Sequence, residues 1–309
     1  MQAPALDVVI VAYRSRDLLR SCLTSLRAHA PTVGARIWVV DNASQDGTPE
    51  MVRSEFSEVE LLVSETNRGF SAANNLAIRQ GRAPYVLVLN PDTQLTHGAL
   101  DRMLELMDAN PTVGIAGCRL ELEDGSFDHA ARRSFPTRIG ALGHFTRIGR
   151  RPNAPGWLAQ YRAASIERGP VDAVNGAFML VRRQALDEVG LFDERYWMYM
   201  EDLDLCYRFR AAGWITWYEP SVVAQHVKGA SSGPYRALRL NYAFHYGMYR
   251  FYREHYAMRS NILVNLAVYT AIAGKFGVSA LRSAVLRRVV AAERRSSQAG
   301  PTGARPSVG

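Results

Sequence analysis

The sequence predicts an α/β protein whose mostly parallel central sheet is flanked by helices and followed by a C-terminal helical extension. Two observations support this fold class. Short β-branched runs alternate with helix-forming stretches of about ten residues through the first 120 positions, which is typical of right-handed βαβ units. The 309 residues also suffice for one substantial core and a small appended region.

The first half of the chain carries the clearest strand and helix patterns. Residues 8–13 (VVIVAY) form a buried strand, and Leu18, Leu19, Cys22 and Leu26 then recur at helical spacing. The further strands expected here are residues 37–40, 60–63, 85–89 and 113–118. Helices are expected through Met51 and Val52, around residues 72–79 and over residues 98–109.

The second half is less regular. Residues 124–170 lose the alternation and carry many Arg, Gly and Pro, so we expect a long adaptable loop region. AVNGAFMLVRR at 173–183 is a strand that runs into a helix. The aromatic and acidic stretch at 196–204 leads to a helix ending at Gly213, and WITWY at 214–218 is a strand.

Composition excludes several classes of protein. A hydrophobic fraction of 48% and a mean hydropathy of -0.14 describe a globular protein and not a polytopic membrane protein. The cysteines Cys22, Cys118 and Cys206 are far apart, which fits a reducing cytoplasm and no disulfide framework. The N-terminal apolar run lacks a preceding basic region, so we interpret it as a strand and not a signal peptide.

Charge is distributed unevenly. From Lys228 onward the chain carries 13 Lys/Arg and 2 Asp/Glu, a balance of +11, so the preceding residues hold −3 of the total of +8. A nucleic-acid-binding protein would carry its basic patch on the folded module, so we expect no nucleic-acid partner. An acidic body with a basic C-terminal third suits an enzyme held against an anionic membrane surface.

Polar clusters follow four of the expected strands. They are Tyr13-Arg14, Asp41-Asn42, Asn67-Arg68-Gly69 and Asn90-Pro91-Asp92. Helix capping explains any one of them, but four in register predict a single crevice, because ligands of open parallel sheets bind beyond the carboxyl ends of the strands.

These clusters suggest a nucleotide site without a glycine-rich phosphate loop. No GxGxxG or GxxxxGK[ST] motif is present. Asp41 is placed to accept hydrogen bonds from a base or ribose, Arg68 to meet phosphate, and Gly69 to let backbone approach the ligand. A solvent-exposed role is the alternative for Arg68. Asp92, with Asn90 beside it, is the candidate site for Mg²⁺ or Mn²⁺ on a diphosphate; a tight structural turn is the alternative.

A second cluster places three carboxylates, Glu201, Asp202 and Asp204, within four residues. Such charges repel one another unless cations or hydrogen bonds compensate them. One of them could act as general base on an acceptor hydroxyl, whereas acidic residues in the first turn of a helix can also be purely structural. His226 alone would be a structural histidine, but after this cluster it could reach the metal or the diphosphate.

In this order the motifs resemble the inverting glycosyltransferases of family 2, which have the GT-A fold. The resemblance covers about residues 6–230 and rests on VVIVAY, VVDNASQDGT, NRGFSAANN, LNPDT, NGAFMLVRR, GLFDERYWMYMEDLDLCYR and the late His226. It implies that Asp41 contacts the nucleotide base, Asp92 is a metal ligand, Asp202 is the catalytic base and His226 is a metal or diphosphate ligand.

Further residues of the same polar and acidic clusters, together with Asn175, are candidates for the site. Tyr13, Asn67, Arg68, Gly69 and Asn90 would complete the donor site, and Glu201, Asp204 and Asn175 would support it or contact the acceptor. Asn90 departs from the family pattern, because an amide stands where the family often has an acid, which leaves Asn90 itself in question as a ligand.

Within the family, LNPDT and FDERYWMYMEDLDLC look most like bacterial rhamnosyltransferases that use dTDP-L-rhamnose. The resemblance implies transfer of rhamnose to a polyprenyl-diphosphate-linked N-acetylglucosamine in cell-wall or polysaccharide assembly. A UDP-sugar donor with a polysaccharide acceptor is the alternative. A non-catalytic scaffold is less favoured, as is a nucleotidyltransferase, because no lysine precedes Lys228.

On this basis we expect three regions, the first of which has two halves. They are a GT-A catalytic domain at 1–230, with a nucleotide-binding half at about 1–120 and an acceptor half at about 121–230, a basic amphipathic helical extension at 231–295 and a disordered tail at 296–309.

The extension is the expected membrane contact. Residues 260–274 are uncharged but too few to span a bilayer, which needs roughly 20 residues. Asn261, Asn265, Lys275, Ser279 and Arg282 fall on one helical stripe, which indicates an amphipathic helix at the inner face of the plasma membrane. The alternative is a helix packed on the protein's own body or on a second subunit of a homo-oligomer.

Overall fold

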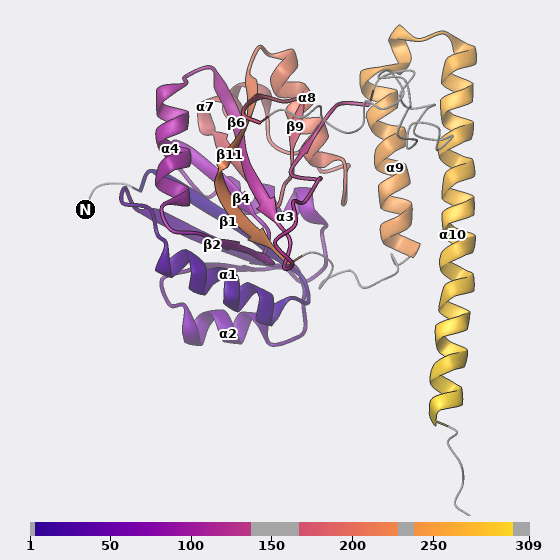
Figure 1. The fold of residues 1–309 in the computed structure, drawn as a ribbon, viewed down its shortest axis with the longest axis horizontal. Helices are drawn as coiled ribbons and strands as arrows, with labels where there is room; N and C mark the ends of the chain where they lie inside the picture. Colours follow the sequence, from indigo (N-terminus) through magenta and orange to yellow (C-terminus); the bar gives the residue numbers. More distant parts are fainter. Residues whose placement is uncertain (1–3, 137–166, 228–237, 299–309) are drawn as a thin grey trace, which may run out of the picture.

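The computed structural model describes residues 4–136, 167–227 and 238–298, which form an α/β body and a pair of long helices beside it (Figure 1). The strands are β1 (Leu6–Ala12), β2 (Ala35–Asp41), β3 (Glu60–Val63), β4 (Tyr85–Leu89), β5 (Thr93–Leu95), β6 (Val113–Glu121), β7 (Arg132–Arg133), β8 (Gly169–Pro170), β9 (Ala173–Val174), β10 (Phe178–Arg182) and β11 (Ile215–His226). The helices are α1 (Arg16–Ala28), α2 (Thr48–Glu55), α3 (Phe70–Ile78), α4 (Ala99–Ala109), α7 (Arg183–Val189), α8 (Glu201–Ala211), α9 (Leu238–His255), the 3₁₀ turn η2 (Ala257–Arg259) and α10 (Ile262–Gln298).

The central sheet has the order β3-β2-β1-β4-β10-β6-β11-β5. Its first four strands are parallel, as the βαβ pattern predicts. β10 then inserts antiparallel between β4 and β6, and β11 runs parallel to β6 but antiparallel to β5. The α/β class is confirmed, and the sheet is parallel in its first half and mixed in its second.

Both faces of the sheet are buried, which explains the continuous apolar runs of its central strands. Along β1, Leu6, Val8 and Ile10 pack with α1, α2 and α4, whereas Val9 packs with α3, α7 and α8 on the opposite face. Successive side chains of a strand point to opposite faces, so each strand contributes to two separate cores. This arrangement leaves the carboxyl ends of the strands as the edge at which a site can form.

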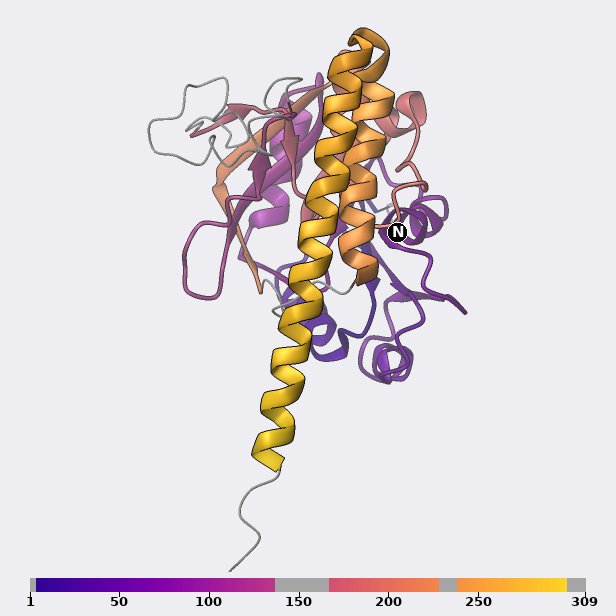
Figure 2. The ribbon, with the colours of Figure 1, turned by 90° about the vertical axis from the view of Figure 1, so that its right-hand side faces the viewer.

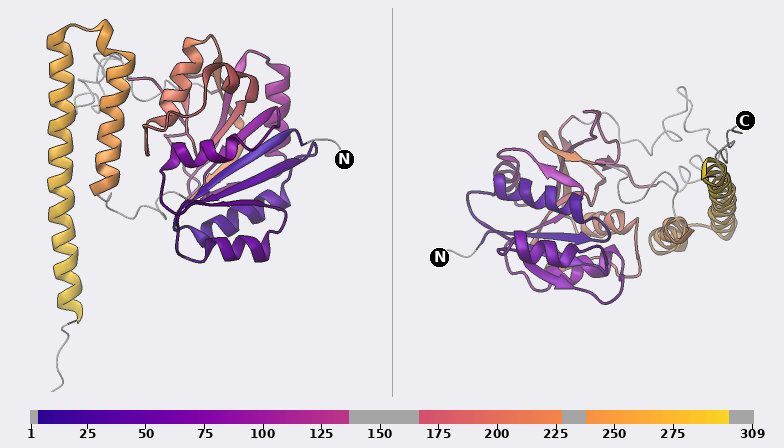
Figure 3. Two further views of the ribbon diagram at one scale, coloured as in Figure 1. Left: turned by 180° about the vertical axis from the view of Figure 1, so that it is seen from behind. Right: turned by 90° about the horizontal axis from the view of Figure 1, so that it is seen from below.

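α9 and α10 form an antiparallel pair beside the body (Figures 1 and 2). Phe251 of α9 belongs to the same buried cluster as α8, so α9 packs on the body. α10 packs on α9 through Tyr252, Val268 and Ile272 and continues past the end of the body (Figure 3). One face of this helical hairpin therefore packs on the protein's own body. This is the alternative to membrane contact that the sequence left open.

Part of the polar stripe of α10 faces α9. Asn265 accepts a hydrogen bond from the Tyr252 hydroxyl at 2.9 Å, and Ser279 bonds Asn241 of α9 at 3.0 Å. The outer face instead carries apolar side chains, with Ile262 81% exposed. The outermost apolar residues of this face are Ile262, Leu263, Leu266, Val278 and Leu281. The helix is thus amphipathic with its polar side turned toward α9.

The length of α10 also corrects the sequence interpretation. Residues 262–284 are long and apolar enough to cross a membrane by length and composition, and only 11% of the most apolar window is buried. The uncharged run at 260–274 alone is too short to span a bilayer. The apolar helix is longer than this run because it continues across Lys275 and Arg282. α10 also runs to Gln298 and passes the expected boundary at 295. Residues 299–309 of the expected tail, and 137–166 of the expected loop, lie outside the described residues.

Candidate active site

The ends of three parallel strands define the candidate site. β1 lies between β2 and β4, with Ala12 opposite Asp41 and Ile10 opposite Leu89. Tyr13, Asp41 and Asn90 therefore follow neighbouring strands at one edge, where adjacent strands are about 5 Å apart. The sequence prediction that these positions share one edge is confirmed by the strand register.

Asp41 is buried at this edge. One carboxylate oxygen, Oδ2, accepts a hydrogen bond from the Ser44 backbone N–H at 3.3 Å. The other, Oδ1, is buried and has no hydrogen-bond partner among the described residues. A buried carboxylate oxygen normally has a partner, so Oδ1 is suited to accept a hydrogen bond from a ligand.

Asn42 organises the loop that carries Asn67, Arg68 and Gly69. Its amide nitrogen donates to Asn67 Oδ1 at 3.2 Å and to the Gly69 carbonyl at 3.1 Å, and its Oδ1 accepts from the Arg68 N–H at 2.9 Å. The Arg68 side chain is exposed. The loop is thus fixed by Asn42, the residue after Asp41, and it carries Arg68 at an exposed position.

Gly69 has a different role from the one expected. A Cβ at this position would lie 2.3 Å from the carbonyl oxygen of Trp197, and the backbone φ is +84°. That φ favours glycine, and the Phe70 N–H donates to the same carbonyl at 2.7 Å. Gly69 therefore makes room for Trp197 and not for a ligand, because the space in front of it is already filled.

Asp92 and His226 are brought together by strand pairing. β5 pairs antiparallel with β11, so that Thr93 lies opposite His226. The His226 Nε2 is 3.4 Å from Asp92 Oδ1, and both side chains are buried. Asp92 Oδ1 has no hydrogen-bond partner in the part of the chain that the structure describes.

This pair fits a divalent cation. A buried carboxylate oxygen without a hydrogen-bond partner, facing an imidazole nitrogen, offers two ligand atoms to one ion. No group of three metal-ligating side chains occurs within residues 4–136, 167–227 and 238–298. A hard cation at Asp92 and His226 would therefore complete its shell with diphosphate oxygens and water, as Mg²⁺ usually does.

Asp128 is a buried partner of His226 that the sequence interpretation missed. Its Oδ2 lies 3.1 Å from His226 Nδ1. Burial lowers the pKa of His226, but the hydrogen bond to Asp128 and the negative charges of Asp92 and Asp128 outweigh this effect and raise the pKa to about 9. Without a cation the imidazole is therefore protonated at neutral pH.

The turn at Asn175, Gly176 and Ala177 joins the two predicted clusters. The Ala177 carbonyl accepts hydrogen bonds from the Asn90 N–H at 3.1 Å and from the Thr93 hydroxyl at 3.2 Å. On the other side, the Gly176 N–H donates to Asp202 Oδ2 at 3.2 Å. Asn175 shapes the turn, since its Oδ1 accepts from the Ala177 N–H. The turn at 175–177 thus connects Asn90 and Asp202, which are more than a hundred residues apart in the sequence.

Asp202 lies at the start of α8 with its orientation fixed. Its Oδ2 pairs with Arg133 and accepts from Gly176, and its Oδ1 accepts from the Leu203 N–H at 2.8 Å. Arg133 is the second residue that the sequence interpretation missed. The carboxylate is 7% exposed, which leaves one small surface for a substrate hydroxyl.

Glu201 is the most perturbed of the three carboxyl groups. Burial raises its pKa to about 8, and the adjacent charge of Asp202 contributes in the same direction. Its Oε2 has no hydrogen-bond partner among the described residues. Glu201 is therefore largely protonated at neutral pH and could donate a hydrogen bond as a neutral acid.

Asp204 does not face the crevice. Its Oδ2 pairs with Arg208 of the same helix, and its Oδ1 lies 2.8 Å from His255 Nε2 of α9. The carboxylate is 1% exposed. Asp204 therefore connects α8 to α9. Of the two roles expected for it, support of the site and contact with the acceptor, these contacts favour support.

The missed residues share one short segment. Asp128 contacts His226 and Arg133 contacts Asp202, and both lie in FDHAARRSF at 127–135. This stretch falls in the region where the alternation of strands and helices is lost. Its only sequence signal is the density of polar residues, which indicates neither a partner nor a direction.

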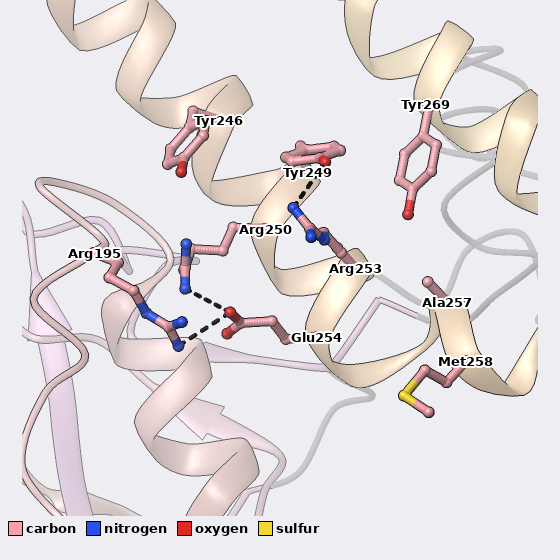
Figure 4. A pocket seen from close by; sticks show the side chains of 9 residues that line it. All are labelled: Arg195, Tyr246, Tyr249, Arg250, Arg253, Glu254, Ala257, Met258 and Tyr269. Carbon is pink, nitrogen blue, oxygen red and sulfur yellow. Dashed lines mark hydrogen bonds and ion pairs between the residues drawn. The ribbon is translucent and has the colours of Figure 1, made fainter.

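A separate pocket of about 680 Å³ lies between Arg195, in the segment before α8, the helix α9 and the start of α10 (Figure 4). It contains none of the predicted site residues. Its polar lining consists of Arg195, Tyr246, Tyr249, Arg250, Arg253, Glu254 and Tyr269. Glu254 pairs there with Arg195 at 3.0 Å and with Arg250 at 2.5 Å.

Solved structures with a similar fold define the class of protein. GalNAc-T7 with UDP, GalNAc and Mn²⁺ aligns with a TM-score of 0.60 at 13% identity, over 82% of this chain and 48% of that chain. The mannosyltransferase PcManGT from Pyrobaculum calidifontis in complex with GDP-Man and Mn²⁺ aligns at 0.57 and 16% identity, over 98% of this chain and 82% of that chain. The fold is thus the GT-A fold of glycosyltransferases.

Residues 7–190 match Glycosyl transferase family 2, and the chain belongs to this family. The N-acetylglucosaminyl-diphospho-decaprenol L-rhamnosyltransferase of Mycobacterium tuberculosis is 36% identical over 241 residues, covering 74% of this chain and 78% of that protein. The rhamnosyltransferase WbbL of Escherichia coli K12 is 26% identical over 226 residues, covering 71% and 82%. The protein is therefore a glycosyltransferase of family 2.

Proposed function

We propose that this enzyme transfers L-rhamnose from dTDP-L-rhamnose to an N-acetylglucosamine carried on a polyprenyl diphosphate. The observation that carries this proposal is the meeting of Asp202 and the Asn90–Asp92 segment across the turn at Gly176 and Ala177. It brings a fixed carboxylate next to a candidate cation site, as single-displacement glycosyl transfer requires. The similarity to the mycobacterial rhamnosyltransferase supports the choice of donor and acceptor.

The site residues would divide the reaction between them. Asp202 accepts the proton of the acceptor hydroxyl as that oxygen bonds to the anomeric carbon, and the bond from this carbon to the diphosphate breaks. Configuration inverts because only one displacement occurs. Arg133 and the Gly176 N–H hold Asp202 in place for this step. Asp41 accepts a hydrogen bond from the nucleotide through its free Oδ1.

The donor diphosphate would lie against Asp92 and His226, with Tyr13, Asn67, Arg68 and Asn90 around it. Asp92 and His226 would hold Mg²⁺ or Mn²⁺, which when bound neutralises the negative charge of the leaving diphosphate. The remaining role of these side chains is to fix where the diphosphate lies, and Arg68 adds a positive charge at the edge of the site.

We further propose that the α9–α10 hairpin holds the enzyme against an anionic membrane on the cytoplasmic side. The apolar outer face of α10 supports this, since Leu263 is 73% and Val278 71% exposed. A lipid-linked acceptor would then be available at the same surface.

A radiolabelled transfer assay tests the proposed reaction. Purified protein receives polyprenyl-diphospho-N-acetylglucosamine, Mg²⁺ or Mn²⁺, and dTDP-L-rhamnose, UDP-galactose, UDP-N-acetylglucosamine or GDP-mannose in parallel. We expect cation-dependent transfer from dTDP-L-rhamnose alone. Transfer from another donor would contradict the donor choice but retain the enzyme class, and no transfer from any donor to this acceptor would contradict the proposed reaction.

A further inference from the structure

Asp128 is held more rigidly than a surface carboxylate. It is 2% exposed, its Oδ1 accepts a hydrogen bond from the Ala130 N–H at 2.9 Å, and its Oδ2 faces His226. Its backbone N–H donates to Leu120 and its carbonyl accepts from Ala131, each at 2.9 Å. The position of the carboxylate is therefore set by the turn after β6 and not by His226.

The two nitrogens of the His226 ring face different carboxylates. Nδ1 is 3.1 Å from Asp128 Oδ2, and Nε2 is 3.4 Å from Asp92 Oδ1. An ionised carboxylate only accepts hydrogen bonds, so Asp128 requires a proton on Nδ1. In a neutral imidazole the other nitrogen then carries the lone pair, and Nε2 becomes the nitrogen able to ligate a cation.

We propose that Asp128 is a positioning residue that fixes the ring and the tautomer of His226, so that Nε2 ligates the cation of the donor complex together with Asp92. This inference rests on the proposed function, because it takes the diphosphate and its cation as ligands of this site. Asp128 does not touch the cation. It acts through the imidazole, as outer carboxylates do for many metal-ligating histidines.

The Asp128→Asn variant is a sharp test because of the second contact of the carboxylate. If the amide oxygen keeps the hydrogen bond from the Ala130 N–H, the amide NH₂ faces His226 Nδ1. That nitrogen must then accept, which moves the proton to Nε2 and blocks ligation. The shape of the side chain is retained, so the variant changes the tautomer more than the packing.

The experiment measures Mn²⁺ affinity by electron paramagnetic resonance in the presence of dTDP, without any turnover. The proteins are the wild type, Asp128→Asn, His226→Ala and the double variant, with Asp124→Asn as the control from the exposed tip of the same turn region. We expect Asp128→Asn to weaken Mn²⁺ binding by about 10- to 100-fold. In the His226→Ala background it should have no further effect, because the two residues act as one unit.

The outcomes separate this inference from the proposed function. A wild type that binds no Mn²⁺ with dTDP contradicts the proposed cation site itself. Tight binding by both wild type and Asp128→Asn overturns the role of Asp128 alone, as does an equal loss with and without His226. Nitrogen NMR of ¹⁵N-histidine-labelled wild type with Mg²⁺ and dTDP gives a reading independent of any variant: Nδ1 should be protonated, and the opposite tautomer overturns the inference.

Discussion

At the scale of single residues, three carboxyl groups of the predicted site have a buried oxygen without a protein partner in the described part of the chain. Asp41 Oδ1, Asp92 Oδ1 and Glu201 Oε2 are all buried and unbonded among the described residues. Each such group costs about 1–3 kcal/mol when nothing compensates it. In the proposed complex, a bound nucleotide sugar and cation would offset this cost at Asp41 and Asp92, which lie in the candidate site.

Glu201 gives a pH prediction at this scale. Its raised pKa means that the folded protein retains a proton that the unfolded chain releases between about pH 4.5 and 8. The stability it contributes is therefore present at low pH and lost as pH rises through this window. We expect Glu201→Gln to become more stable relative to wild type from pH 5 to pH 8, by on the order of 2 kcal/mol.

Urea unfolding at pH 5 and pH 8 measures this difference. Glu123→Gln, at an exposed position, is the control and should show no such trend. A constant difference between Glu201→Gln and wild type at both pH values would show that Glu201 is not held protonated.

At the scale of elements, the helix that carries Asp202 is tied to the C-terminal hairpin. Asp204 of α8 pairs with Arg208 and with His255 of α9. Phe251 adds an apolar contact between the same elements. α8, which carries Asp202, is therefore linked to α9 by an ion pair and by an apolar contact.

Removing the contact between His255 and Asp204 should have a measurable effect on stability. His255→Ala should lower the free energy of unfolding by about 1–3 kcal/mol, because Asp204 loses a charge-assisted hydrogen bond in a buried setting. Trypsin should also cleave the arginine-rich α9 faster. The exposed His97→Ala is the matched control. A melting temperature and cleavage rate equal to those of wild type would contradict the tie.

Local sequence patterns predicted which segments are helices and strands better than they predicted which of these elements lie next to one another. VVIVAY and YVLVL were identified as strands because both faces of the parallel sheet are buried, and Asp41 and Asn90 were placed correctly at strand ends. The antiparallel insertion of β10 depends on β4 and β6, which are distant in sequence. Asp128 and Arg133 act through long-range contacts that no spacing along the chain records, and helical periodicity cannot indicate which face of α10 meets α9.

At the scale of the whole molecule, the protein has a body with the proposed catalytic edge and a hairpin whose outer face is apolar. The polar groups of α10 are directed to α9, and Leu263 and Leu266 are directed outward. This arrangement is unfavourable in water and favourable against hydrocarbon. The proposed membrane contact would therefore lie on the side of α10 that faces away from the body (Figure 3).

Charged substitutions on this face test the orientation. The double variant Leu263→Glu, Leu266→Glu should bind vesicles containing anionic phospholipid at least about tenfold more weakly than wild type, because two apolar side chains are no longer buried. Co-sedimentation measures binding, and Glu123→Gln again serves as the control. If the face joins two copies of the chain instead, the variant will change the oligomeric state in sedimentation velocity and leave vesicle binding unchanged.

The most direct test of the central claim is a comparison of donor binding and turnover in the Asp202→Asn variant. Asp202 is proposed to act only on the acceptor proton, so calorimetry should give an affinity for dTDP-L-rhamnose within about twofold of wild type, while transfer should fall by at least about 100-fold. Turnover near the wild-type rate in a variant that binds donor normally would contradict the assignment of Asp202 as the base.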